Sequence, residues 1–137
     1  MKMRIALYQM ADRGEAELNI KQAYQIIVAT SADFFVLPEF FAIPGGDFRR
    51  NYSLEGCWQE TGQPARTMLK AASQKFGGYI IGGSILEKAG CKYYNTCYVF
   101  RAGRQIAKYR KVNITREEVD SGITPGTKPV IFATPYG

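Results

Sequence analysis

Residues 33–39, with the sequence DFFVLPE, decide the fold class of this chain. Their four apolar residues run without a polar break and end at Pro38, a pattern typical of a strand buried on both faces of a sheet. Residues 3–8 also have a strand pattern, and residues 15–30 between the two have a helical one. The expected apolar stripe of that helix consists of Leu18, Ala23, Ile26 and Ile27. An opening of strand, helix and strand predicts the α/β class.

The middle of the chain is predicted to hold a second helix. Residues 44–60 are polar and irregular and indicate a long excursion. Pro64 then begins a helix that Gly77 ends, because proline suits the first turn of a helix and glycine suits its end. The apolar stripe of this helix is Ala65, Met68, Leu69, Ala72 and Phe76.

From residue 79 onward the apolar pattern changes to a period of two. It predicts strands at residues 79–86, 92–100 and 104–109, joined as a meander by turns at residues 88–90 and 102–103. Apolar side chains lie on both faces of the middle strand, which favours a layered sheet over a barrel. Residues 116–129 are expected to form another long loop.

The C-terminus is expected to leave the sheet incomplete. Residues 130–133 (VIFA) have a strand pattern, and residues 134–137 (TPYG) have the composition of a turn that leaves it. No return strand follows, although natural domains generally avoid an unpaired apolar edge. We therefore expect residues 1–137 to be the N-terminal part of a longer single domain.

Composition excludes several classes of function. The chain has 137 residues, of which 46% are hydrophobic, and a formal charge of +6, as expected for one globular domain. It has no histidine, which excludes Ser-His-Asp and Cys-His catalysis and most zinc sites. No apolar run is long enough for a signal peptide or a bilayer span. We therefore expect a cytoplasmic protein without membrane contacts.

The basic residues do not predict a nucleic-acid partner, because they are scattered apart from one cluster. The cluster consists of Arg101, Arg104, Lys108, Arg110 and Lys111. Strand parity places Lys111 on one face with Gln105 and Tyr109, and the other cations of that strand on the opposite face. The charges are therefore not expected to form a single patch.

Two charged residues stand at the ends of predicted strands. Glu39 follows the strand at residues 33–37, where open α/β sheets place functional groups, and its apolar neighbours are expected to raise its pKa, as suits a general base. Lys111 has the parity of an inward-pointing residue, so its ammonium could pair with a carboxylate and stabilise an oxyanion. Taken singly, a solvated loop glutamate and a lysine that extends to solvent remain open alternatives.

The remaining ionisable residues have structural interpretations. Glu117 and Glu118 suit the first turn of a short helix, where acidic residues interact favourably with the helix dipole. Cys57, Cys91 and Cys97 lack paired CxxC spacing, and none stands at a strand-to-helix turn, so we predict reduced thiols and no metal. The glycine pairs at 77–78 and 82–83 match no nucleotide-binding motif and indicate tight packing instead.

Seven short segments occur in an order that resembles the carbon-nitrogen hydrolase (nitrilase) family over almost the whole chain. They are residues 5–9 (IALYQ), 37–39 (LPE), 61–62 (TG), 81–84 (IGGS), 94–96 (YNT), 109–111 (YRK) and 124–126 (TPG). The resemblance implies a four-layer αββα sandwich, of which this chain would be the N-terminal part. It also implies a Glu-Lys-Cys triad that uses no histidine and no cofactor.

By this resemblance Glu39 matches the general base, and Lys111 matches the lysine that stabilises the tetrahedral intermediate. Glu118 is the best match to a second glutamate beside that lysine, with Glu117 one register away. In the family a cysteine thiolate attacks a nitrile, amide or carbamoyl carbon, ammonia or an amine leaves, and water hydrolyses the thioester. The implied partners are a small-molecule substrate of that kind and further copies of the chain in a homo-oligomer.

The chain departs from the family pattern at two places. The family cysteine lies on the strand after the turn at which residue 137 stands, so we expect the 137-residue chain alone to be inactive. Asn113 stands where a histidine is common in the family. A catalytically inactive homologue that serves as a binding or scaffold module is the alternative interpretation.

Overall fold

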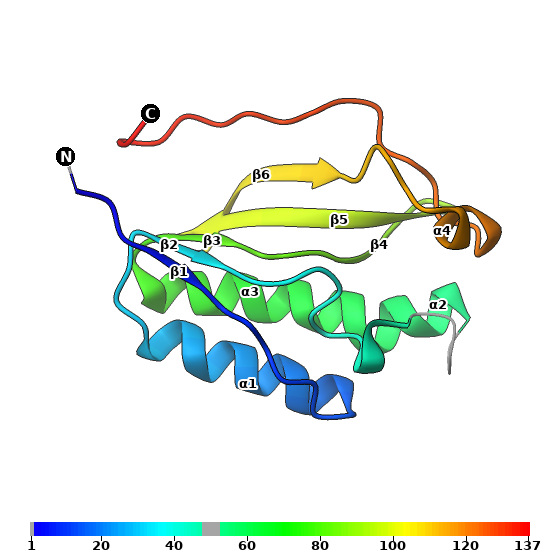
Figure 1. Cartoon of the computed structure of the whole chain (residues 1–137), viewed down its shortest axis with the longest axis horizontal. Helices are drawn as coiled ribbons and strands as arrows, with labels where there is room; N and C mark the ends of the chain where they lie inside the picture. The colour runs from blue at the N-terminus through cyan, green and yellow to red at the C-terminus, as the bar shows by residue number, and fades with distance from the viewer. Residues whose placement is uncertain (1, 48–52) are drawn as a thin grey trace.

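The computed structural model describes residues 2–47 and 53–137 and contains a sheet of six strands with its helices (Figure 1). The first half of the chain contains β1 (Ile5–Leu7), α1 (Ala16–Ala29), β2 (Phe34–Val36), a 3-10 turn (Pro44–Gly46), α2 (Leu54–Cys57), a π-helical segment (Trp58–Gly62) and α3 (Gln63–Phe76). The second half contains β3 (Tyr79–Ile81), β4 (Ile85–Ala89), β5 (Lys92–Arg101), β6 (Arg104–Arg110) and α4 (Arg116–Asp120).

The sheet has a parallel half and an antiparallel half. β1, β2 and β3 pair in parallel, and β5 pairs antiparallel with β3 and β4 on one side and with β6 on the other. Figure 1 shows α1 and α3 together on one face of this sheet. The predicted α/β class is confirmed, with helices covering one side of the sheet as in half of a layered sandwich.

Helix α3 carries the predicted stripe to the core. All five predicted residues are buried, and they pack with Ile27, Phe35 and Tyr98 in one apolar cluster. The helix ends where Gly77 takes the left-handed conformation, with φ of +79°. A glycine adopts this conformation without steric cost, which is why it serves as the helix stop.

The predicted stripe of α1 is partly wrong. Ala23 and Ile27 are buried, but Leu18 and Ile26 are 43% and 39% exposed. Asn19 completes the buried stripe instead, at helical spacing from Ala23 and Ile27. A polar side chain can lie there because its oxygen accepts from the main-chain N–H of residue 13 and its amide donates to the carboxylate of residue 12, each at 2.8 Å.

The strand predicted at residues 79–86 is divided into β3 and β4. Both lie along the same edge of β5, where Ile81 pairs with Val99 and Ile85 pairs with Thr96. Three residues, 82–84, therefore lie opposite two, 97 and 98, and form a bulge between the two strands. A bulge bends a strand and redirects its side chains and main-chain groups.

A second irregularity corrects the predicted parity of β6. Phe100 pairs with Gln105 but Val99 pairs with Ala107, so Ile106 is an extra residue in β6. Gln105 therefore faces α3, where its side-chain oxygen accepts from Arg66 Nη2 at 3.2 Å. The prediction that it shares a face with Lys111 is wrong, because the bulge changes the alternation between these positions.

Residues 130–133 are not a strand, so that prediction is also wrong. Ile131 is 96% exposed, and the ring of Phe132 lies 6.0 Å from the ring of Tyr79 in β3. The segment passes over aromatic side chains and not along a strand edge, so its main chain has no strand to pair with. The predicted turn at residues 134–137 is confirmed by two main-chain hydrogen bonds between Thr134 and Gly137.

Two predicted loops contain helices. Within the predicted excursion at residues 44–60, α2 and the π-helical segment make residues 54–60 helical, while residues 48–52 lie outside the described residues. The loop predicted at residues 116–129 begins with α4. The side chain of Thr115 caps α4, and capping groups of this kind stabilise helices too short to be stable alone.

Candidate active site

Glu39 lies three residues after the end of β2, in a loop that the bulge at residues 82–84 supports. Ser84 Oγ accepts from the main-chain N–H of Phe40 at 3.1 Å, and the N–H of Ser84 donates to the carbonyl oxygen of Pro38 at 3.3 Å. Gly83 completes the support, since its φ of +56° and its closeness to Pro38 leave no room for a side chain. The glycines at 82–83 therefore serve tight packing, as predicted.

We expect Gly83→Ala to destabilise the fold by about 1–3 kcal/mol through backbone strain, with a further cost from steric overlap. A β-carbon at this position would lie 1.9 Å from the carbonyl oxygen of Pro38. Gly14→Ala is the matched control, because Gly14 has φ of +78° but a β-carbon added there would meet no atom within 4 Å. Urea denaturation of both variants measures the difference, and equal losses would contradict the packing role of Gly83.

Glu39 and Phe40 point in different directions. Phe40 has φ of +49°, a left-handed conformation that is uncommon for a bulky residue and clusters at functional sites. Phe40 is 7% exposed, whereas the side chain of Glu39 is 56% exposed. The expected desolvation of Glu39 by its apolar neighbours is therefore not found in the described chain, because the neighbours turn into the core and the carboxylate does not.

Lys111 follows β6 and brings its ammonium to Glu39. Its main-chain N–H donates to the carbonyl oxygen of Asn95 in β5 at 2.8 Å, which extends the ladder by one residue and sets the direction of the side chain. Lys111 Nζ lies 2.9 Å from Glu39 Oε1 and 3.0 Å from Glu118 Oε2. Partial burial disfavours the charged ammonium, but the two carboxylates outweigh it and raise the pKa of Lys111.

Glu118 is the buried carboxylate of the site. It is 3% exposed, and its Oε2 accepts from the main-chain N–H of Thr115 at 2.7 Å while Thr115 Oγ1 accepts from the N–H of Glu118. This reciprocal capping box orients the side chain toward Lys111. Burial favours the neutral acid, but hydrogen bonds from Asn95, Thr115 and Lys111 outweigh it and lower the pKa of Glu118.

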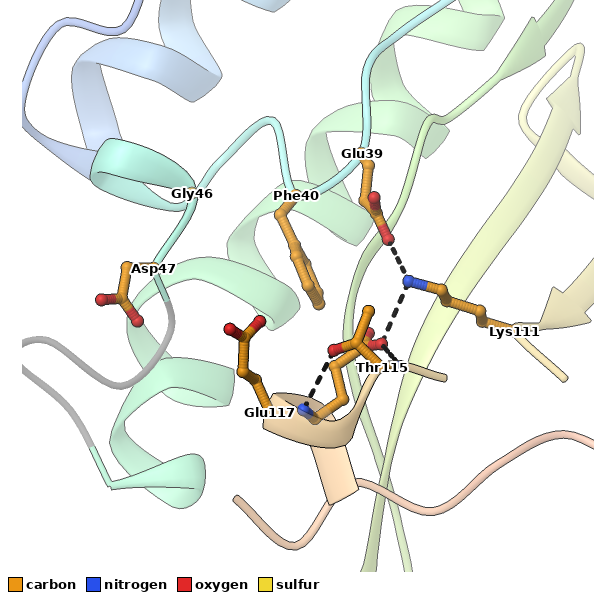
Figure 2. Close-up of a pocket in the computed structure, with 8 residues that line it drawn as sticks. Glu39, Phe40, Gly46, Asp47, Lys111, Thr115 and Glu117 are labelled. Carbon is orange, nitrogen blue, oxygen red and sulfur yellow. Dashed lines mark hydrogen bonds and ion pairs between the residues drawn. The ribbon is translucent and has the colours of Figure 1, made fainter. Parts of the chain in front are cut away.

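The two candidate glutamates of α4 have different surroundings. Glu118 is joined to Lys111, whereas Glu117 is exposed and its carboxylate points away from Lys111 in the pocket (Figure 2). The capping box separates them, because the third residue of a helix folds back on the cap and the second does not. The structure therefore brings together Glu39, Lys111 and Glu118.

Asn95 is a residue of the site that the sequence reasoning did not single out. Its side-chain nitrogen donates to Glu39 Oε1 and to Glu118 Oε1, both at 2.7 Å, and it is 2% exposed. The available signal was an amide in the middle of a strand of mainly aromatic and apolar residues. Such a group requires hydrogen-bond partners and therefore predicts polar neighbours.

Two adjoining pockets share Glu39 and Lys111. One has a volume of about 320 Å³ and is lined mainly by polar groups, among them Thr115 and Glu117 (Figure 2). The other has a volume of about 300 Å³ and is lined mainly by apolar side chains of the sheet. The apolar lining comprises Val36, Leu37, Ile81, Cys97 and Tyr109. The charged pair therefore lies between a polar and an apolar space, as in many small-molecule sites.

The cysteines differ in accessibility. Cys57 is buried, and burial raises its pKa. Cys97 lines the apolar pocket, and burial raises its pKa to about 11. Cys91 is exposed in the turn between β4 and β5. Within residues 2–47 and 53–137, no three Cys, Asp or Glu side chains gather as metal ligands would, and no helix is long and apolar enough to cross a membrane.

A comparison with known protein families shows to which family this chain belongs. The profile of the family described as Carbon-nitrogen hydrolase matches residues 4–137, which is nearly the entire chain. The chain belongs to the carbon-nitrogen hydrolase family. This confirms the resemblance that the seven ordered segments indicated.

Relatives and solved structures of the carbon-nitrogen hydrolase family agree with this assignment. The omega-amidase NIT2 of Danio rerio is 32% identical over 98% of this chain and 52% of its own length. A carbon-nitrogen hydrolase from Helicobacter pylori has the same fold, with a TM-score of 0.77 at 22% identity over 91% of this chain and 45% of that chain. A nitrilase-superfamily member from Saccharomyces cerevisiae has a TM-score of 0.75 at 25% identity, over 98% and 52%. The chain spans about half the length of the curated relatives that it matches.

Proposed function

We propose that this chain supplies the base and the electrostatic part of an amidase site that hydrolyses a carbon–nitrogen bond in a small molecule. The observation that carries the proposal is the contact of Lys111 Nζ with Glu39 at 2.9 Å and with Glu118 at 3.0 Å. Of the two carboxylates, Glu39 is exposed to the pocket and Glu118 is buried. This division suits a carboxylate that moves protons and a second one that holds the lysine in place.

In the proposed reaction Glu39 acts as general base and then as general acid. It takes the proton of a thiol as the sulfur attacks the amide carbon, and a carbon–sulfur bond forms. Lys111 stabilises the negative charge that develops on the former carbonyl oxygen. Glu39 returns the proton to nitrogen as the carbon–nitrogen bond breaks and ammonia leaves. The same carboxylate then takes a proton from water as the water attacks the thioester, and it returns that proton to sulfur as the carbon–sulfur bond breaks and the acid leaves.

The thiol nucleophile is proposed to come from outside residues 1–137. A thiol with a pKa of about 11, as at Cys97, is mostly protonated at neutral pH, and Cys57 is buried. Cys91 lines neither of the two pockets that contain Glu39. This chain would then be the N-terminal part of a longer hydrolase domain and inactive alone.

The proposed substrate is a small molecule that ends in a carboxamide. The support is the name omega-amidase of the Danio rerio relative, which denotes action on a terminal amide. The pocket of about 320 Å³ beside Glu39 and Lys111 is of a size that suits a small molecule. Nitriles and N-carbamoyl compounds are the other substrate classes to include in an assay.

Ammonia release from a panel of terminal amides tests the proposal on two samples. The purified 137-residue chain is expected to release none. The protein carrying this sequence in its source cells, isolated with an antibody to the chain, is expected to release ammonia and to have an intact mass well above 15.3 kDa. Release by the 137-residue chain that Glu39→Gln abolishes would contradict the proposed external nucleophile. An inactive source protein of 15.3 kDa would favour the binding or scaffold module instead.

A further inference from the structure

The two carboxylates of the site share a second hydrogen-bond donor besides Lys111. Asn95 Nδ2 donates to Glu39 Oε1 and to Glu118 Oε1 at 2.7 Å each. Lys111 Nζ contacts the same Glu39 oxygen at 2.9 Å and the other Glu118 oxygen at 3.0 Å. The four side chains therefore form a closed ring in which two donors alternate with two acceptors.

We infer that Asn95 is a positioning residue, which holds Glu39 at a fixed separation from Glu118 and turns one particular Glu39 oxygen toward the pocket. The inference rests on the proposed role of Glu39 as the base. Glu39 Oε1 accepts from both Asn95 and Lys111, whereas no residue within 2–47 and 53–137 donates to Oε2. Oε2 is thus the oxygen available to take a proton, and Oε1 is the oxygen that anchors the side chain.

Asn95 is held firmly enough for this task. It lies in the middle of β5, is 2% exposed, and pairs with Leu86 of β4. Its carbonyl oxygen accepts from the main-chain N–H of Lys111 at 2.8 Å. One residue therefore sets the main-chain position of the lysine and the side-chain positions of both carboxylates, and it does so from the rigid centre of the sheet.

The amide is chemically suited to bridge two carboxylates beside a lysine. Its two N–H groups satisfy one oxygen on each carboxylate without adding a charge. A cation at position 95 would compete with Lys111 for the same carboxylates, and a carboxylate would repel them. An apolar residue would leave the buried Glu118 with one donor fewer, which favours its neutral form.

Nuclear magnetic resonance of the 137-residue chain tests the bridge without any assay of activity. Glu39→Gln is expected to move one of the two Asn95 Nδ2 proton resonances upfield and Glu118→Gln to move the other, because each proton loses a charged acceptor. Asn95→Leu is expected to raise the pKa of Glu118, followed through its labelled carboxyl carbon. Unmoved Nδ2 protons in both glutamine variants, or an unchanged Glu118 pKa in Asn95→Leu, would overturn the inference.

Thr96→Val is the matched control, since it removes one hydrogen bond to a different carboxylate from the next residue of the same strand. Thr96 Oγ1 donates to Glu87 Oε2 at 2.6 Å on the opposite face of the sheet. This variant is expected to leave the Asn95 protons and the Glu118 pKa unchanged. If Asn95→Leu does not fold, the two glutamine variants still decide the question, because both keep Asn95.

Kinetics of the amide-hydrolysing source protein separate this inference from the proposed function. Asn95→Leu is expected to lower kcat by on the order of 10²-fold with KM little changed, as for a displaced catalytic group. An unchanged kcat in an active protein would overturn the positioning role and leave the proposed function intact. A source protein without any hydrolysis would defeat the proposed function, while the resonance measurements would still report on the bridge.

Discussion

Glu39→Gln is expected to lower kcat for amide hydrolysis by about 10²–10⁴-fold, the usual contribution of a general base, with little change in KM. Glutamine keeps the shape of the side chain, and its oxygen can still accept from Asn95 and from Lys111, which bind Glu39 Oε1 at 2.7 and 2.9 Å. It cannot take a proton from a thiol. The measurement is steady-state ammonia release by the source protein and its variant.

Glu117→Gln is the control for this prediction. Glu117 lines the same polar pocket and carries the same charge, but it is exposed and no ion pair of the described residues joins it to Lys111. Its change to glutamine is expected to leave kcat within a few-fold of the original. Equal losses in both variants would mean that the charge of the pocket matters and not the contact of Glu39 with Lys111.

Glu87→Ala is expected to destabilise the fold by about 3–5 kcal/mol, the usual cost of removing one partner from a buried charge cluster. Glu87 is 7% exposed and accepts from Lys108, Arg110 and Thr96 at 2.6–2.9 Å. Alanine would leave Lys108 and Arg110 without their carboxylate, and Arg110 would remain against the ring of Tyr94. Denaturant unfolding of the 137-residue chain measures the loss.

The same carboxylate makes stability depend on pH. Burial raises the pKa of Glu87, but hydrogen bonds from Arg110, Lys108 and Thr96 outweigh it and lower the pKa from 4.5 to about 2. A lowered pKa contributes stability that is present above the unfolded value and is lost as the pH falls through the folded value. The contribution is about 3 kcal/mol at pH 7 and is expected to disappear between about pH 4.5 and pH 2.

Glu55→Ala is the control for both effects of Glu87. Glu55 forms an ion pair with Lys88 at 2.6 Å, but its side chain is 39% exposed, and exposed pairs contribute little. This variant is expected to unfold almost as the original chain does and to keep most of the loss of stability between about pH 4.5 and pH 2. A flat pH dependence in the original chain would contradict the role given to Glu87.

The periodicity of apolar residues was enough to predict those helices and strands whose structure depends on one continuous stretch of chain. The stripe of α3 lies entirely in the core, and its glycine stop has the expected left-handed conformation. Alternation was sufficient to turn Lys111 toward the face opposite Lys108 and Arg110, because the residues from 107 to 111 contain no bulge. These features depend on neighbours within a few residues, where helical and strand periods are reliable guides.

Predictions from the alternation of residues were wrong at two bulges in the same sheet. One extra residue at Ile106 moved Gln105 to the helix-covered face, and one at residues 82–84 divided a predicted strand into β3 and β4. A bulge reverses the alternation of side chains between the two faces of a strand. A period-two pattern in the sequence cannot show where such a bulge lies. The prediction of a strand at residues 130–133 was wrong for another reason. These residues have a high β-propensity, but a strand also needs the edge of a neighbouring strand with which to form hydrogen bonds.

Patterns along the chain were enough to predict the α/β class, the family and the two charged residues at strand ends, Glu39 and Lys111. Their contact with each other follows from the folded chain alone, since 72 residues separate them in the sequence. The tertiary structure also decided that Glu118 and not Glu117 joins them, and that Asn95 binds both carboxylates. These contacts depend on the register between neighbouring strands and on the cap that orients Glu118. Neither feature can be predicted from the spacing of residues along one strand.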